Sequence, residues 1–153
     1  MLRRNRVSNV QLTTYTDYAL RVLIYLGIQR QDKRSNIKDI SAFYHISNNH
    51  LGKVVHELGK LGIIDTVRGR NGGIKHAKHP SEINIGAIVR ETEKPIHLVE
   101  CFNSESNMCK ISPACRLKGV LYEALQAYFK VLEQYTLEDL LQNRDQLKEL
   151  LLK

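Results

Sequence analysis

The sequence predicts a mainly α-helical protein with one small β-hairpin, and three observations carry this prediction. Apolar residues recur at the spacing of a helical face in several segments of the chain. The β-branched run from Ile63 to Val67 leads through a glycine-rich turn at residues 68–73 to Ile74, which is typical of a hairpin. The composition, 42% hydrophobic and 25% charged over 153 residues, suits a single globular domain.

Three helices are expected before the hairpin. The first runs from Thr14 to Leu26, where apolar residues repeat every three or four positions. Ser35 or Asn36 can cap a second helix of about two turns, and Ser47 can cap a third. The inward faces expected for the second and third helices are Ile37, Ile40 and Tyr44, and Leu51, Val54, Val55 and Leu58.

Further helices are expected after the hairpin. A short one is predicted around residues 83–89, ending before Pro95, and a loop at about 96–113 follows it. A long amphipathic helix then covers about 114–135, and Thr136 with Asp139 forms a capping box that begins a last helix. One helix cannot bury the apolar seam of the long helix alone, so we expect a homodimer. That seam is Leu117, Leu121, Leu125, Tyr128, Leu132 and Tyr135.

Two short helices joined by a turn at residues 44–47, with a hairpin behind the third helix, follow the plan of a winged helix-turn-helix. The motif often has a glycine in this turn, where a compact residue or one that tolerates positive φ fits more easily, and His45 stands there instead. The predicted organisation has four segments. These are a basic N-terminal extension at 1–10; a winged helix-turn-helix region at 11–80, with its helix-turn-helix at about 37–60 and its wing at about 63–77; a connecting helix and cysteine loop at 81–113; and a dimerisation helix with a C-terminal helix at 114–153.

The basic charge of the chain is local. Residues 1–79 carry 14 Lys and Arg against 5 Asp and Glu, whereas residues 80–153 carry 9 against 11. A basic module of this kind suits double-stranded DNA, although a solvated basic surface is the alternative. No stretch approaches the roughly 18 apolar residues of a membrane span, and no apolar signal-peptide region follows the first arginines. We therefore expect a cytoplasmic protein with no membrane partner.

The third helix and the wing supply the candidate DNA-binding residues. Residues near the N-terminal end of a recognition helix reach base edges in the major groove, and glycines let a wing tip approach phosphates or a minor groove. For the two asparagines of the helix, capping is the alternative role. The candidates are Asn48, Asn49, His50 and Lys53 in the helix, and Arg68, Arg70, Asn71 and Lys75 in the wing.

All three cysteines of the chain, Cys101, Cys109 and Cys115, fall within fifteen residues. An odd number in a cytosolic protein argues against a disulfide framework and for metal or redox chemistry. The spacing C-x7-C-x5-C leaves three possibilities open: an iron–sulfur cluster, a zinc site completed by His97, and free thiols that sense oxidants.

Enzymatic activity is not expected. The sequence contains no Ser-His-Asp arrangement and no paired carboxylates in a pocket pattern. The glycines at 69, 72 and 73 lie in the hairpin instead of before a helix, so they do not form a phosphate-binding loop.

Three motifs carry a resemblance to a known family. They are Gln-Leu-Thr-Thr-Tyr-Thr-Asp-Tyr-Ala-Leu at 11–20, Val-Arg-Gly-Arg-Asn-Gly-Gly-Ile at 67–74 and Ile-Ser-Pro-Ala-Cys-Arg-Leu at 111–117. From residue 11 onward the chain resembles the iron–sulfur winged-helix regulators, a family that includes a nitric-oxide-sensitive repressor and a regulator of cluster assembly. The resemblance implies that Cys101, Cys109 and Cys115 hold a [2Fe-2S] or [4Fe-4S] cluster beside the dimerisation helix.

The same resemblance bears on the fourth ligand and the signal. The regulator of cluster assembly has a histidine three residues after its third cysteine, and Lys118 stands here instead. In the nitric oxide sensor, an acidic residue at the start of the first helix reaches the partner's cluster, and Asp17 matches that position. The resemblance thus implies a DNA-binding repressor that responds to nitric oxide. The alternatives are a regulator of iron–sulfur assembly or redox state, or a zinc-containing winged-helix module that binds proteins.

Overall fold

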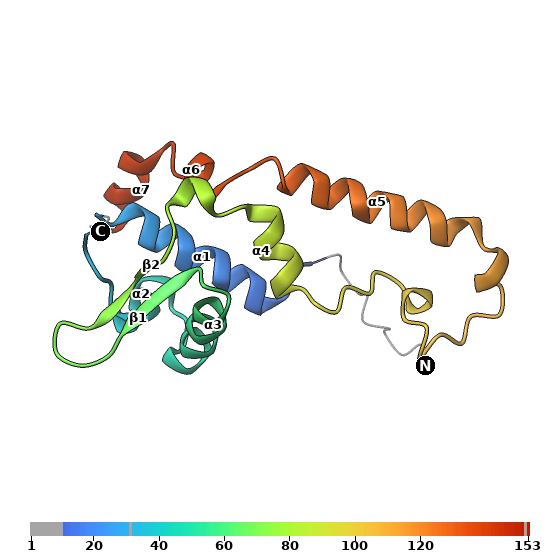
Figure 1. The fold of residues 1–153 in the computed structure, drawn as a ribbon, viewed down its shortest axis with the longest axis horizontal. Helices are drawn as coiled ribbons and strands as arrows, with labels where there is room; N and C mark the ends of the chain where they lie inside the picture. The colour runs from blue at the N-terminus through green and yellow to red at the C-terminus, as the bar shows by residue number, and fades with distance from the viewer. Residues whose placement is uncertain (1–10, 31, 152) are drawn as a thin grey trace, which may run out of the picture.

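The computed structural model describes residues 11–30, 32–151 and 153, and the basic extension expected at 1–10 lies outside them. Figure 1 shows the first four helices and the hairpin gathered at one end, with a long helix leading from there to a loop at the other end. The α-helices are α1 (Thr14–Ile28), α2 (Ile37–Tyr44), α3 (Asn48–Lys60), α4 (Ile85–Thr92), α5 (Arg116–Leu132), α6 (Leu137–Leu140) and α7 (Arg144–Leu151). The strands are β1 (Ile64–Val67) and β2 (Gly73–His76), and 3-10 turns lie at Pro80–Glu82, Glu100–Phe102 and Ser112–Ala114. The mainly helical fold class with one hairpin is confirmed.

Side-chain caps begin the three helices of the winged helix-turn-helix region, α1, α2 and α3. The Thr13 hydroxyl accepts a hydrogen bond from the Thr16 amide, and the Ser47 hydroxyl accepts one from the His50 amide. Of the two caps considered for α2, Asn36 is the one used, because its side chain accepts from the Lys38 amide at 2.9 Å. His45 adopts φ 54° in the turn between α2 and α3, as expected for that position.

The hairpin is antiparallel, and a third segment extends it. Ile64 pairs with His76 and Val67 with Gly73. Ser35, just before α2, forms two 2.9 Å backbone hydrogen bonds with Ile74 of β2. The wing is therefore hydrogen-bonded to the connection between α1 and α2, a pairing that the sequence did not predict.

The core lies where α1 packs on α3, α4 and the hairpin. Its largest fully buried side chains come from distant parts of the chain: Leu23, Ile40, Leu51, Leu58, Ile74, Ile83, Phe129 and Leu137. Because every element of the winged helix region contributes to this one cluster, α3 and the wing have a fixed relative position.

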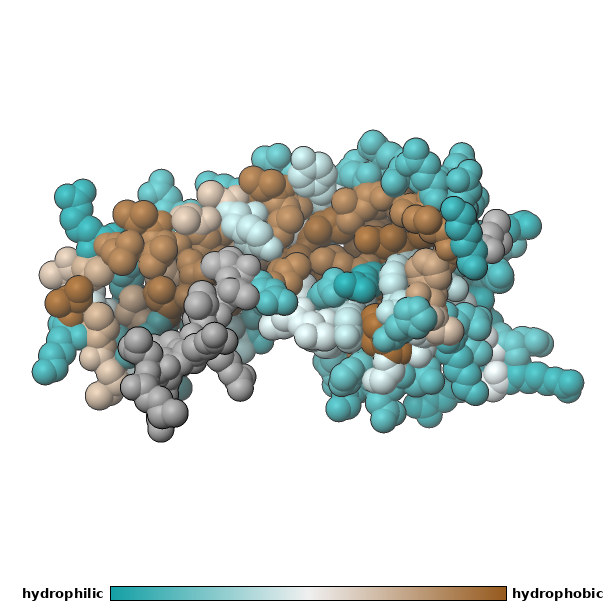
Figure 2. Space-filling model, turned by 180° about the vertical axis from the view of Figure 1, so that it is seen from behind, coloured by the Kyte–Doolittle hydropathy of each residue, from teal (hydrophilic) through white to brown (hydrophobic). Residues whose placement is uncertain are grey.

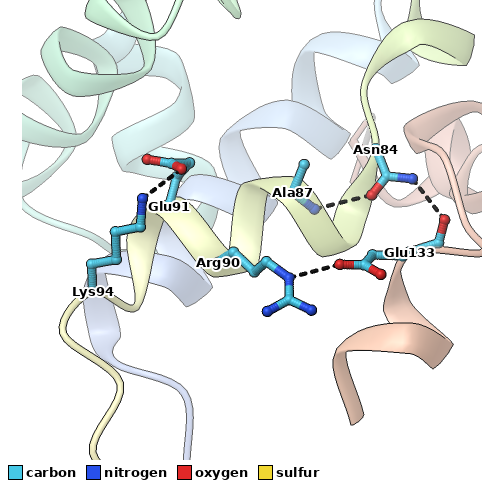
Figure 3. A network of polar contacts seen from close by, with 6 residues as sticks. All are labelled: Asn84, Ala87, Arg90, Glu91, Lys94 and Glu133. Carbon is cyan, nitrogen blue, oxygen red and sulfur yellow. Dashed lines mark hydrogen bonds and ion pairs between the residues drawn. The ribbon is translucent and has the colours of Figure 1, made fainter. Parts of the chain in front are cut away.

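A polar network joins the start of α4 to the end of α5 (Figure 3). The Asn84 amide group donates to the Glu133 carbonyl at 2.7 Å, and the Glu133 carboxylate lies 2.6 Å from Arg90 Nε. Gly86 permits this approach, because a Cβ there would lie 2.4 Å from Cγ of Glu133. The end of the long helix is thereby attached to α4, which in turn packs on α1.

The C-terminal region differs from the single last helix that was expected. The capping box of Thr136 and Asp139 is present, but it begins only the four-residue α6, and α7 follows as a separate helix. Leu141, between them, is buried, and its side chain packs so closely on Gly27 that a Cβ there would lie 2.4 Å from it. The chain turns at this contact with α1.

Candidate nucleic-acid interface and cysteine site

The polar residues proposed to read DNA lie on the first turns of α3. Asn48, Asn49, His50 and Lys53 are all exposed, while Leu51, Val54, Val55 and Leu58 are buried. Ser47 caps the helix, so its capping does not need the two asparagine side chains. The helix therefore presents an amide-rich and basic face at its N-terminal end.

Aromatic and basic side chains of α1 lie beside this face. The ring of Tyr18 is 6.3 Å from the ring of His50, and the Arg21 guanidinium is 6.0 Å from the centre of the Tyr18 ring. The Tyr44 hydroxyl donates to the Arg21 carbonyl at 3.1 Å. Burial raises the pKa of Tyr44 to about 12, so this hydroxyl keeps its proton at neutral pH. The sequence pattern did not predict these contacts of Tyr18, Arg21 and Tyr44.

The wing places its cations around a tight turn. Arg68, Arg70 and Asn71 are exposed, and Lys75 is half-buried in β2. Asn71 adopts φ 65°, and a Cβ at Gly72 would lie 2.3 Å from the Val67 carbonyl oxygen, so the turn depends on glycine there. The tip thus brings two arginines and an asparagine together.

The charges of this face are not neutralised within the described part of the chain. Among these residues, no carboxylate lies within 4.0 Å of the side-chain nitrogens of Lys53, Arg68, Arg70 or Lys75. Uncompensated cations on α3 and the wing attract a polyanion.

Asp17 lies in the first turn of α1 with its carboxylate engaged by Arg21. The distances are 2.8 Å from Oδ2 to Nη2 and 3.0 Å from Oδ1 to Nε. This hydrogen bonding raises the pKa of Arg21 above its usual value. Both side chains are about four-tenths exposed, so the carboxylate is also open to other partners.

The cysteines lie along the loop between α4 and α5. Cys101 is in the turn Glu100–Phe102, Cys109 is on an exposed stretch, and Cys115 is the N-cap residue of α5. All three thiols are free. The Cys115 side chain makes no capping hydrogen bond to α5. Its thiol therefore lies at the positive, N-terminal end of the helix dipole without a helix partner.

A cleft of about 930 Å³ lies between this loop and α5. Cys101 and Cys115 both line it, together with His97 and Lys118, whereas Cys109 does not. Within the described residues, no three or more His, Cys, Asp and Glu side chains gather into a group able to hold a metal ion. The chemistry of the donors still fits an iron–sulfur cluster, because three free thiols lie on one short loop and two of them line one cleft.

The long helix exposes an apolar stripe, which differs from the seam that was expected. Leu125 and Leu132 pack against the core of the same chain. The exposed stripe is Leu117, Val120, Ala124, Tyr128 and Val131. Leu117 and Tyr128 belong to the expected seam, and Tyr135 of that seam is also exposed, just beyond the end of α5. Figure 2 shows apolar side chains gathered along α5 on the back of the molecule. None of the helices formed by the described residues combines the length and apolar character needed to cross a membrane.

The known proteins to which this chain is similar are transcriptional regulators. The Rrf2 family, described as iron-dependent transcriptional regulators, matches residues 12–143. The chain is 62% identical over 142 residues to the HTH-type transcriptional regulator NsrR of Halalkalibacterium halodurans, covering 93% of this chain and 97% of that protein. The regulator of the same name from Bacillus subtilis is 53% identical over 142 residues, with the same coverage of 93% and 97%.

Solved structures agree on the fold. Staphylococcus aureus CymR is 26% identical with a TM-score of 0.68, and the match covers 85% of this chain and 97% of that one. IscR of T. potens has a TM-score of 0.70 at 22% identity, covers 88% of each chain, and supports the fold alone. The matched relatives are transcriptional regulators and not enzymes. The chain is a DNA-binding transcriptional regulator that belongs to the Rrf2 family, and the family match covers residues 12–143.

Proposed function

We propose that the chain is a homodimeric repressor whose affinity for operator DNA is controlled by an iron–sulfur cluster that reacts with nitric oxide. The observation that carries this proposal is the placement of three free thiols on the loop that leads into α5, with Cys101 and Cys115 on one cleft. The high identity to regulators named NsrR supports the choice of signal.

The DNA-binding part of the proposal assigns a role to each exposed element. Asn48, Asn49, His50 and Lys53 on α3 read the major groove, where amide and basic side chains pair with base edges. Arg68, Arg70, Asn71 and Lys75 hold the wing on the phosphate backbone or in an adjoining minor groove.

The cluster part assigns Cys101, Cys109 and Cys115 as ligands, with Asp17 of the second subunit as the fourth. When bound, a [2Fe-2S] or [4Fe-4S] cluster supplies electron-rich iron with affinity for small diatomic molecules. Cys109 does not line the cleft, so its loop must rearrange for three thiolates to hold one group. Cys115 lies at the N-terminal end of α5, and Lys118 stands where a histidine would indicate the assembly regulator.

The coupling between cluster and DNA follows from the attachment of α5. A second copy of this chain covers the apolar stripe of α5, and Asn84 and Glu133 fasten the end of α5 to α4. A change in the cysteine loop at the start of α5 therefore shifts one recognition helix relative to its partner. Two recognition helices must meet half-sites about 34 Å apart. A hundredfold loss of affinity requires only about 2.8 kcal/mol between the two states.

An anaerobic DNA-binding titration tests the proposal as a whole. Protein purified without oxygen should show the absorption of an iron–sulfur cluster and bind promoter DNA tightly. Cluster-free protein and protein treated with nitric oxide should bind at least tenfold more weakly. A Cys115→Ser variant should lack the absorption and match cluster-free protein. A colourless protein with stoichiometric zinc, or equal affinities in all states, would contradict the cluster mechanism.

A further inference from the structure

The segment just before α2 runs beside the wing. Ser35 forms two 2.9 Å backbone hydrogen bonds with Ile74, one in each direction, and Ser35 is buried. Gly73 lies so close to this segment that a Cβ on it would be 2.8 Å from the Ser35 carbonyl oxygen and 3.1 Å from Arg34 Cβ. Backbone hydrogen bonds and close packing therefore hold this segment against the wing.

Arg34 projects its guanidinium to the turn of the wing. Its Nη1 atom donates a hydrogen bond to the Asn71 carbonyl oxygen at 3.3 Å. The Arg34 residue is exposed, and no described carboxylate lies within 4.0 Å of its nitrogens. A carbonyl partner fixes the position of the group without neutralising its charge.

We propose that Arg34 is a further DNA contact of this regulator, which binds the phosphate backbone from its place beside the wing. The inference rests on DNA binding by the wing, and adds a residue from outside the helix-turn-helix and the hairpin. A guanidinium has five N–H donors, and the described structure uses one of them on Asn71. The remaining donors suit the paired oxygens of a phosphate.

The local charge supports this role. Arg34 contacts the turn that also carries Arg68 and Arg70, so three cations without carboxylate partners in the described chain lie at or beside this turn. Duplex DNA presents one charge per about 1.7 Å of its axis, so such a surface meets more than one phosphate. The alternative is that Arg34 only braces the turn through Asn71.

The salt dependence of binding to a short random-sequence DNA duplex distinguishes these roles, since each phosphate contact contributes about 0.9 to the slope of log K against log salt. In a dimer, Arg34→Ala should lower the slope by about 1.8. Arg34→Lys keeps the charge and should keep the slope. Arg30→Ala is the matched control, because Arg30 lies on the same connection but is 3.4 Å from Asp32.

Each outcome has a distinct meaning. A wild-type protein that fails to bind any duplex contradicts the proposed function itself. If Arg70→Ala lowers the slope and Arg34→Ala leaves it at the wild-type value, only the assignment of Arg34 is overturned. A slope that falls equally in Arg34→Lys and Arg34→Ala would also overturn it, because loss of the brace would then explain both. Equal thermal midpoints for all variants exclude unfolding as the cause.

Discussion

Asp17 Oδ2 lies 2.8 Å from Nη2 of Arg21, one helical turn further along α1. An ion pair with both partners this exposed contributes about 0–1 kcal/mol, so it does not bind the carboxylate strongly. Arg21 also lies 5.7 Å from the centre of the Tyr44 ring, which places the pair beside α2. The carboxylate proposed as the partner's cluster ligand is therefore linked through Arg21 to the helix-turn-helix, and ligation would have to compete with Arg21.

Asp17→Ala should shorten the lifetime of the cluster and leave the dimer intact. The variant removes one proposed ligand but none of the apolar stripe of α5. Cluster absorbance followed during anaerobic treatment with a chelator measures the effect, and sedimentation measures the dimer. An unchanged decay together with an unchanged response to nitric oxide would assign Asp17 to the helix end alone.

Arg21→Ala provides the matched comparison for Asp17. It removes the competing guanidinium and leaves the carboxylate in place, so the cluster should last as long as in wild type or longer. A cluster that decays as fast in Arg21→Ala as in Asp17→Ala would indicate a general effect of the ion pair on α1.

Asn49→Ala should reduce specificity for the operator. A side chain that pairs with a base edge contributes about 1–3 kcal/mol of discrimination, and Asn49 is exposed on the first turn of α3. Binding to the promoter should weaken while binding to random duplex stays the same, as measured by competition in fluorescence anisotropy. Lys60→Ala is the control at the far end of α3, where Lys60 is paired with Glu57 at 2.8 Å.

The sequence predicted the elements whose signals are local. Ser47 and Asn36 are caps, and Thr136 with Asp139 forms a capping box, because these contacts span only two or three residues. His45 at φ 54° shows that the turn requires a left-handed residue whatever its side chain. The sequence also predicted correctly that the glycines of the wing lie in the hairpin.

The sequence did not predict the features that depend on tertiary packing. Helical spacing alone cannot tell whether Leu125 faces the same chain or a partner, and packing on the core settled that it faces the same chain. The pairing of Ser35 with Ile74 joins residues 39 positions apart and has no periodic signal. The position of Arg34 beside Asn71 follows from that pairing, and the sequence did not predict it either.

Val120→Asp should separate the dimer. Val120 lies in the exposed stripe of α5 with 60% of its surface accessible, and a carboxylate buried at an interface between two copies is costly. Sedimentation velocity should show a monomer, and operator binding should fall because one recognition helix meets only one half-site. Lys130→Asp introduces the same group on the polar side of α5 and should leave the dimer intact. A dimer in both variants would remove the stripe from the interface.

Gly72→Ala should weaken DNA binding without unfolding the protein. The added Cβ would lie 2.3 Å from the Val67 carbonyl oxygen and 2.8 Å from that of Gly69, so the backbone of the turn must shift. The turn is exposed, so the core is unaffected, and we expect a loss of affinity of about tenfold, or about 1.4 kcal/mol. Asn71→Gly is the companion variant, because glycine accepts φ 65° and removes only the side chain. Near-normal affinity of Gly72→Ala would show that the shape of the turn is unimportant.

His76 should make the stability of the protein depend on pH. Burial lowers the pKa of His76 below its usual value of 6.5, with a smaller contribution from the charge of Arg144, while the 2.9 Å contact of Nε2 with the Leu23 carbonyl opposes the shift. A histidine whose pKa is lower in the folded state is protonated more readily when unfolded. Its contribution to stability is therefore complete above pH 6.5 and is lost as the pH falls through the lower, folded pKa.

Urea denaturation at pH 5.5 and pH 7.5 measures this dependence. Wild type should be more stable at the higher pH, and His76→Gln should reduce the difference between the two values. His56→Gln, at an exposed position on α3, is the control for loss of a histidine as such. Because His76 joins β2 to α1, a stability difference that persists unchanged in His76→Gln would mean that this contact between wing and core is insensitive to pH.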